Sequence, residues 1–161
     1  MLADGEPVSS TRIRALVAQG HMGGAAELLG RPYGYFAEVR HGQQLGRQLG
    51  TPTLNQEIPK TFVLPRFGVY ASRVYLLGSA YCGVTNVGLR PTVDGHHVTA
   101  ETWLPDYSGP EFYGETVRTD LLHFLRPEQK FPSVEALGKQ IQTDGERAKD
   151  FLRRNAKELF A

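Results

Sequence analysis

Two oxygen-bearing side chains, those of Thr53 and Asn55, lie two positions apart in the stretch LGTPTLN, residues 49–55. In an extended segment, side chains with this spacing face the same way. A hydroxyl and an amide carbonyl are hard oxygen donors of the kind that Mg²⁺ accepts alongside phosphate and water. The spacing is therefore compatible with a magnesium site, although a cluster of Gly, Pro, Thr and Asn is also typical of a plain capped turn.

A run of regularly spaced glycines precedes this pair, in the segment HGQQLGRQLGTPTLN, residues 41–55. Gly42, Gly46 and Gly50 recur every four residues, and Arg47 lies among them. Glycines let backbone N–H groups approach an anion closely, and an arginine can pair with phosphate. The Walker pattern of Gly-Lys-Ser/Thr does not occur, so the segment does not resemble a P-loop. It predicts a phosphate-binding loop of another kind.

The bulk composition limits the protein that must position these groups. The chain has 161 residues, enough for one domain with a real core, and a formal net charge of +1. This charge does not point to nucleic acid or an anionic membrane as a partner. A single cysteine, Cys82, excludes a disulfide framework and suits a reducing cytoplasm. We find neither a membrane-spanning apolar run nor a signal-peptide pattern, and we expect a cytoplasmic protein.

The first thirty residues have a helical pattern. Ser9 or Ser10 can cap a helix, and one face of that helix would carry Ile13, Leu16 and Val17. Gly20 is a typical end for it. A second short helix is expected over residues 23–29, ended by the sequence Gly-Arg-Pro.

The middle of the chain has a strand pattern. Segments rich in β-branched and aromatic residues alternate with glycine-containing breaks, which favours an antiparallel sheet closed into a sandwich or barrel. The expected strands are residues 33–40, 69–76, 80–87, 98–104 and 116–124. The longest break, residues 56–68, is expected to be a surface loop.

The chain returns to a helical period after Pro132. Ser133 is a plausible N-cap. The apolar positions follow one helical stripe, formed by Val134, Leu137, Ile141, Ala148, Phe151 and Leu152. The opposite face is charged, and is most simply solvated.

Four ordered motifs resemble the riboflavin kinase family. The run GxxxGxPTLN, residues 46–55, is similar to the PTAN signature of that family. VTNVGLRPT at 84–92, AETWLPDYSGPEFYGE at 100–115 and FLRPEQKF at 124–131 match further family segments in the same order. The resemblance covers roughly residues 29–149. It implies a mainly β protein: a closed antiparallel Greek-key β-barrel of about six strands with a C-terminal α-helix and a short N-terminal helical segment.

The resemblance also implies a reaction and a set of site residues. The enzyme would be an ATP:riboflavin 5′-phosphotransferase, which moves the γ-phosphoryl group of ATP to the ribityl hydroxyl of riboflavin with Mg²⁺, and Glu101 would be the catalytic base. Thr53 and Asn55 would hold the metal. The ATP-binding residues would be Gly42, Gly46, Arg47, Gly50, Pro52 and Tyr113. The flavin-binding residues would be Arg126, Glu128 and Phe131, and Asn86 and Arg90 would lie near the site.

Some of these residues have equally ordinary structural explanations. Tyr113 fits a core aromatic as well as an adenine contact. Glu128 could be a solvated side chain after Pro127. The loop residues Gln43-Gln44-Leu45 and the bulky Leu54 depart from the family pattern, and we expect them to affect nucleotide affinity more than reaction type.

A further resemblance concerns the start of the chain. VSSTRIR, residues 8–14, is similar to the end of the adenylyltransferase module of bifunctional riboflavin kinase/FMN adenylyltransferases. The nucleotidyltransferase motif HxGH is missing, since His21 in GHMGG does not fit it. We therefore expect residues 1–30 to be a helical linker from an absent module and residues 31–161 to be the kinase barrel. Such a chain would not make FAD by itself.

Two other functions are compatible with a flavin-binding barrel. One is a sensor or regulator that binds flavin or nucleotide without transfer, and the other is an unrelated flavoprotein such as a flavin reductase. A pure binder needs neither a metal pair nor a base. Thr53, Asn55 and Glu101 therefore favour the kinase.

Overall fold

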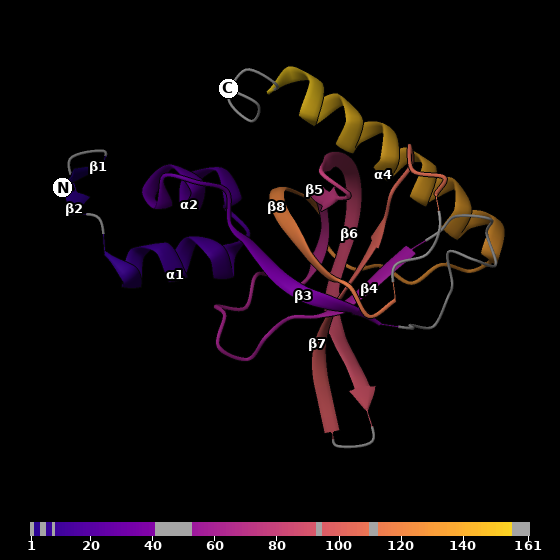
Figure 1. Cartoon of the computed structure of the whole chain (residues 1–161), viewed down its shortest axis with the longest axis horizontal. Helices are drawn as coiled ribbons and strands as arrows, with labels where there is room; N and C mark the ends of the chain where they lie inside the picture. Colours follow the sequence, from indigo (N-terminus) through magenta and orange to yellow (C-terminus); the bar gives the residue numbers. More distant parts are fainter. Residues whose placement is uncertain are drawn as a thin grey trace.

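The computed structural model describes residues 2–3, 6–7, 9–40, 53–92, 95–109 and 113–155. A β-barrel forms its centre, α4 lies along one side of the barrel, and α1 and α2 lie at the N-terminal end (Figure 1). The elements are β1 (Leu2–Ala3), β2 (Glu6–Pro7), α1 (Ser10–Gln19), α2 (Met22–Leu29), β3 (Gly34–Arg40), β4 (Thr53–Glu57), β5 (Gly68–Leu76), β6 (Ser79–Thr92), β7 (Gly95–Trp103), β8 (Thr116–Arg126) and α4 (Val134–Arg154).

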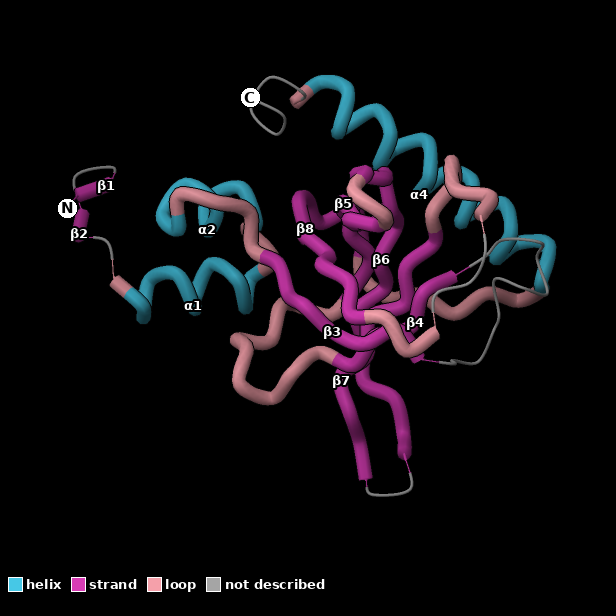
Figure 2. The backbone as a smooth tube through the Cα atoms, in the orientation of Figure 1, coloured by secondary structure: helices cyan, strands magenta, loops and turns pink. Residues whose placement is uncertain are grey.

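Six strands close the barrel in the order β3-β4-β7-β6-β5-β8, and all neighbours are antiparallel. β5, β6 and β7 follow one another as neighbours, and β8 returns to pair with β5. This is the Greek-key arrangement. The predicted mainly β barrel with a C-terminal helix is confirmed. In Figure 2 the strands of the barrel are magenta and the helices are cyan.

One strand of the barrel was not predicted. Thr53–Glu57 forms β4, where the sequence suggested a turn followed by a surface loop. Gln56 is buried inside the barrel, and its amide donates to the carbonyl oxygens of Ala37 (2.8 Å) and Val117 (2.9 Å). The expectation of a loop is therefore wrong for residues 56 and 57. A glutamine at an inward-facing position breaks the alternation of apolar and polar residues by which a strand is recognised in a sequence. It can be buried here because the backbone of neighbouring strands accepts its hydrogen bonds.

The helix α4 covers an outer face of the barrel. Ser133 caps it by accepting a hydrogen bond from the Ala136 backbone N–H (3.1 Å), as predicted. Its buried side chains pack against outward-facing residues of β5, β6 and β8. This shared cluster contains Val69, Ala71, Val84, Leu122, Leu125, Ala148 and Leu152, with Cys82, Trp103 and Phe151 packed against it.

A glycine allows α4 to approach the barrel closely. Gly145 is buried in the middle of the helix, where a Cβ atom would lie 2.8 Å from the ring of Trp103. Glycine is otherwise unfavourable in a helix interior. The contact therefore explains this residue, and it sets the spacing between α4 and β7.

The N-terminal helices share the core of the barrel. Ser9 caps α1, and Gly20 ends it in the left-handed conformation, as the sequence predicted. Val17 of α1 and Met22 of α2 belong to the same buried cluster as Tyr35 and Tyr70 of the barrel. The two helices therefore pack against the barrel.

Two irregularities in β8 change the direction of its side chains. The pairing of β8 with β5 shifts register twice, between Val69 and Tyr70 and between Ala71 and Ser72. Tyr70 pairs with Phe124. Val69, which directly precedes Tyr70 on β5, pairs with Arg126, so Leu125 has no partner between them. Such a bulge adds one residue to one strand and re-aims the side chains beyond it. Phe124 consequently packs with the barrel core, and Arg126 lies on the outer face.

Candidate active site

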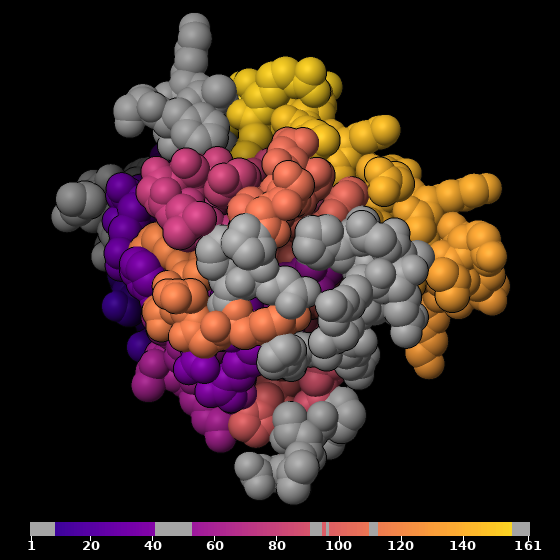
Figure 3. All heavy atoms as spheres, turned by 45° about the vertical axis from the view of Figure 1, so that its right-hand side comes forward, coloured from indigo at the N-terminus to yellow at the C-terminus, as the bar shows by residue number. Residues whose placement is uncertain are grey.

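A pocket of about 710 Å³ lies between the outer wall of the barrel and α4. Figure 3 shows α4, in yellow and orange, exposed on one side of the surface beside the barrel. The barrel strands provide Thr53, Val69, Val84, Asn86, Arg90, Glu101, Trp103 and Arg126. The following loop and α4 provide Glu128, Gln129, Lys130, Phe131, Ser133, Val134, Leu137, Ile141 and Asp144.

The register of five strands aligns several polar residues across this wall. Asn55 of β4 pairs with Glu101 of β7, which pairs on its other side with Asn86 of β6. The same row continues through Val69 of β5 to Arg126 of β8. Directly opposed residues in a sheet point to the same face. We call these five residues the pocket row.

Glu101 is aimed at the pocket by the alternation of β7. Its neighbours Ala100 and Thr102 are buried in the barrel interior, so Glu101 and Trp103 face outward together. The carboxylate of Glu101 and the indole ring of Trp103 thus line the same pocket.

Thr53 and Asn55 provide oxygen donors near Glu101. Both are half-buried, and they alternate with the buried residues Leu54 and Gln56. Thr53 lines the pocket, and Asn55 is the cross-strand neighbour of Glu101. A hydroxyl and an amide oxygen on one face suit a hard cation that takes its other ligands from phosphate and water. Within the described ranges, no three His, Cys, Asp or Glu side chains gather as a metal site.

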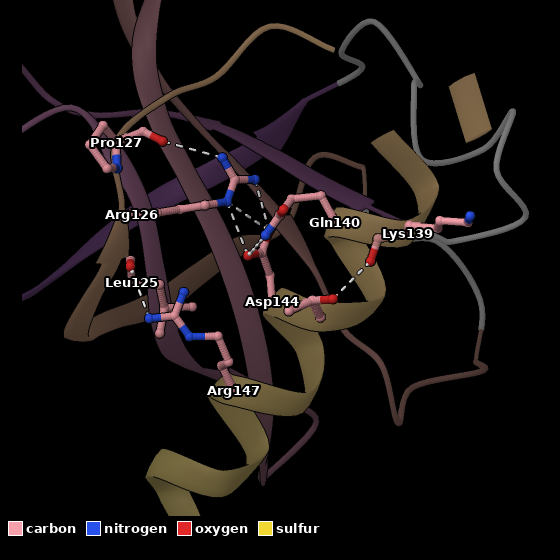
Figure 4. Close-up of polar contacts among 8 residues, drawn as sticks. Leu125, Arg126, Pro127, Lys139, Gln140, Asp144 and Arg147 are labelled. Carbon is pink, nitrogen blue, oxygen red and sulfur yellow. Dashed lines mark hydrogen bonds and ion pairs between the residues drawn. The ribbon is translucent and has the colours of Figure 1, made fainter. Parts of the chain in front are cut away.

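The polar contacts of Arg126 fix one end of the pocket (Figure 4). Its Nη2 and Nε donate to the carboxylate of Asp144 on α4, at 2.8 and 3.0 Å. Gln140 adds a third donor to the same carboxylate, at 3.0 Å. The side chain of Asp144 is only 1% exposed and that of Arg126 is 15% exposed. A bidentate, buried pair of this kind holds the guanidinium plane in one orientation.

The loop after β8 lies against the barrel through its charged and aromatic residues. The carboxylate of Glu128 is 3.6 Å from Nη1 of Arg90. It lies over Gly88, where a Cβ atom would be only 2.1 Å from Oε1 of Glu128. The Arg126 guanidinium lies 5.6 Å from the centre of the Phe131 ring. Arg90, Arg126, Glu128 and Phe131 therefore meet at one pocket, although they come from two strands and a loop.

Asn86 has a buried oxygen without a partner. Its Oδ1 atom is inaccessible to solvent and accepts no hydrogen bond within the described structure. Buried polar atoms are nearly always paired, so each exception needs an explanation. The sequence placed Asn86 near the site without a role.

The remaining predicted residues are elsewhere. Tyr113 is half-buried and packs against the barrel cluster that contains Val39 and Leu104, with Tyr81 and Tyr107 nearby. It is not among the described residues that line the pocket. The predicted ATP-binding residues Gly42, Gly46, Arg47, Gly50 and Pro52 lie outside the described part of the chain.

The sequence reasoning missed the contribution of α4. Leu137, Ile141 and Asp144 all line the pocket. A signal was available for Asp144: it follows Ile141 by three residues and precedes Ala148 by four, so it interrupts the apolar stripe. A carboxylate on a buried helical stripe indicates a paired charge.

Nothing in the described helices is long and apolar enough to span a membrane.

Comparisons with known proteins agree with the fold and the motifs. A family described as riboflavin kinase (Flavokinase) matches residues 29–152. A bifunctional riboflavin kinase/FMN adenylyltransferase of Haemophilus influenzae is 42% identical over 150 residues, which are 92% of this chain and 48% of that protein. The enzyme of the same name from Listeria monocytogenes is 33% identical and covers 93% of this chain and 48% of its own length. The chain thus spans about half the length of these relatives.

Two solved structures are similar to this chain in fold. A crystal structure named a macrolide-efflux protein from Streptococcus pneumoniae is 33% identical, has a TM-score of 0.84 and covers 91% of this chain and 48% of its own. Riboflavin kinase from Trypanosoma brucei is 25% identical, with a TM-score of 0.54, and covers 76% of this chain and 80% of its own. From the family match and these relatives, the chain belongs to the riboflavin kinase family.

Proposed function

We propose that this chain transfers the γ-phosphoryl group of ATP to the terminal ribityl hydroxyl of riboflavin, giving FMN and ADP. One observation carries the proposal: Glu101 and Thr53 line the same pocket as an apolar wall of Trp103, Leu137 and Ile141. A flavin needs both kinds of surface, because its ring system is largely apolar and its reacting hydroxyl is polar. Ligand pockets are typically apolar with a few placed polar groups.

Glu101 is the proposed general base. Its carboxylate would accept the proton of the ribityl hydroxyl as the oxygen attacks phosphorus. Thr53 and Asn55 would hold Mg²⁺ through their hydroxyl and amide oxygens. The ion would neutralise charge on the phosphates, which is the main catalytic requirement of phosphoryl transfer. The pairing of Asn55 with Glu101 supports the assignment, since it brings metal donors and base onto neighbouring strands.

The flavin ring is proposed to lie between the barrel wall and α4. Phe131 would flank its apolar face. Arg126, oriented by Asp144, would present its remaining N–H groups to the polar edge of the ring. Glu128 would close this side of the pocket against Arg90.

The nucleotide side of the site is proposed on the resemblance to the family. The ATP phosphates would contact the loop that contains Gly42, Gly46 and Arg47, with Gly50 and Pro52 before β4. Tyr113 would contact the adenine from its position beside a barrel cluster, against which its partly buried ring packs.

The relation to the longer relatives is a separate proposal. We propose that residues 1–30 connect the barrel to an N-terminal FMN adenylyltransferase module, as the names and lengths of the relatives suggest. This chain would then make FMN, and FAD formation would need the second module.

The test is the formation of FMN and ADP from riboflavin and Mg·ATP by this chain and by Glu101→Gln. Loss of a general base lowers kcat by about 10²- to 10⁴-fold, whereas riboflavin affinity should change little. Glu38→Gln, at an exposed position of β3, is the matched control and should keep parental activity. A parent that binds riboflavin yet forms no FMN would contradict the kinase and favour the binding module.

A further inference from the structure

We infer that Asn86 selects flavins with a hydroxylated side chain, by accepting a hydrogen bond on Oδ1 from a secondary hydroxyl of the ribityl group. The inference rests on the proposed function and adds a specificity residue to it. It starts from the buried, unpaired Oδ1 atom in a residue that lines the pocket.

The side chains directly beside Asn86 on its face of the sheet have no donor to offer, and no described side chain donates to its Oδ1 atom. Across the strands it lies between Glu101 and Val69. An ionised carboxylate only accepts hydrogen bonds, and valine has no polar group. Along β6 the neighbours on the same face are Val84 and Gly88, which also have no donor in their side chains. A hydroxyl group of the molecule that occupies the pocket would supply the donor that the described side chains do not provide.

The position of Asn86 identifies the part of the substrate that would donate. Opposed residues in a sheet have their Cβ atoms about 4.5 to 5.5 Å apart, so the amide lies beside the proposed base. If Glu101 accepts the proton of the terminal hydroxyl, the groups next to it on the ribityl chain would lie beside Asn86, and a rotation of the amide would bring Oδ1 to them. Those groups are secondary hydroxyls, which can donate.

A substrate without these hydroxyls would leave the oxygen buried and unpaired in the complex. A site built to hydrogen-bond a hydroxyl rejects an analogue that lacks it, because the buried acceptor then loses water without gaining a partner. We expect the parent to prefer riboflavin, by about 10- to 100-fold in kcat/KM, over a flavin whose N10 chain is 5-hydroxypentyl.

The experiment measures kcat/KM and Kd for both flavins in the parent, Asn86→Leu and Asn86→Ala. The preference for riboflavin should fall about tenfold or more in both variants, mainly through loss of riboflavin binding. Asn86→Leu should also keep or raise the Tm, because it replaces an unpaired buried acceptor by an apolar group of similar size. Gln142→Leu, an exposed amide on α4, is the control and should keep the parental preference.

The outcomes separate this inference from the proposed function. Equal losses for both flavins would overturn it and give Asn86 a purely structural role. An unchanged preference would also overturn it, with water satisfying the oxygen. If the parent binds riboflavin without forming FMN, the kinase proposal fails, and the Kd values for the two flavins still decide the role of Asn86.

Discussion

On each of two outer faces of the barrel, a buried aspartate is paired with an arginine. The two pairs differ in the elements that they connect. On the pocket face, Asp144 of α4 holds Arg126 of β8 and joins the helix to the sheet. On the opposite part of β8, which we call the far face, Asp120 accepts from Arg118 (2.8 Å), Arg73 (3.5 Å) and the Tyr75 hydroxyl (3.2 Å). The four residues of this charge cluster belong to β5 and β8.

The elements that each pair connects distinguish a charge pair with only a structural role from a charge pair at the candidate active site. The far-face pair stays within one sheet, so its geometry follows from the register of two strands. The pocket pair joins two elements and leaves part of a guanidinium facing a pocket. Removing the charge of either aspartate should therefore lower the stability by a similar amount. Only the change on the pocket face should affect riboflavin binding.

The largest effects are expected from Asp144→Asn and Asp120→Asn. Each leaves a buried arginine without its countercharge, which costs about 3 to 5 kcal/mol in free energy of unfolding. Only Asp144→Asn should also raise the KM for riboflavin, by about tenfold, because Arg126 is released. Denaturant unfolding and steady-state kinetics on the folded protein measure both quantities.

An exposed pair on the same helix provides the control for this comparison. Asp150→Asn removes the 2.9 Å contact with Arg154 and should cost less than about 1 kcal/mol. A rise in riboflavin KM for Asp120→Asn equal to that for Asp144→Asn would show that the two faces are not functionally distinct.

A smaller, matched effect is expected from the glycines that lie against a carboxylate on each face. A Cβ atom at Gly34 would lie 2.1 Å from Oδ1 of Asp120 and 2.7 Å from the backbone oxygen of Thr119. Gly34→Ala should cost about 1 to 3 kcal/mol, since backbone must move. At Gly88 the atoms that must move are the ends of two flexible side chains: Glu128, in an exposed loop, and Arg90, whose Nη1 atom would lie 2.9 Å from the Cβ atom.

Gly88→Ala should accordingly keep the parental Tm within a few degrees and raise the riboflavin KM by several-fold. Thermal unfolding and riboflavin titration of both alanine variants test the contrast. The expectation fails if Gly88→Ala unfolds as easily as Gly34→Ala.

The smallest effects are expected from the two phenylalanines that lie beside an arginine. Arg118 is 5.3 Å from the Phe36 ring centre on the far face, and Arg126 is 5.6 Å from that of Phe131. Each contact is worth about 0.5 to 1 kcal/mol at a solvent-accessible site. Phe36→Ala and Phe131→Ala should lower the stability by similar small amounts, and only Phe131→Ala should weaken riboflavin binding. Fluorescence titration of riboflavin distinguishes them.

The sequence predicted most of the elements because their patterns are local. The helix after Ser133 has a clear apolar stripe, and the five predicted strands have the expected composition. β4 was missed because Gln56 is polar, yet buried, and its amide is satisfied only by strands that are distant in the sequence.

Seven of the predicted site residues line one pocket: Thr53, Asn86, Arg90, Glu101, Arg126, Glu128 and Phe131. Their positions relative to one another depend on the fold. The pocket row combines residues from five strands. A pattern within one strand does not indicate which residues of the neighbouring strands lie opposite it. Asp144 was missed because no motif includes it. The unpaired oxygen of Asn86 could not be predicted, since it depends on what its cross-strand neighbours lack.

The extra residues in β8 have a consequence for how protein sequences of this kind should be compared. Phe124 and Arg126 would share a face in a regular strand, but their partners Tyr70 and Val69 are adjacent on β5, because Leu125 is the extra residue of the bulge. An insertion of one residue between Val69 and Tyr70 would give Leu125 a partner and turn the arginine to the same face as Phe124, toward the barrel interior. An alignment that scores residue identity and tolerates a one-residue gap in β5 would therefore accept a chain without this part of the site. For the pairing of β5 with β8, the lengths of the two segments are as informative as their composition.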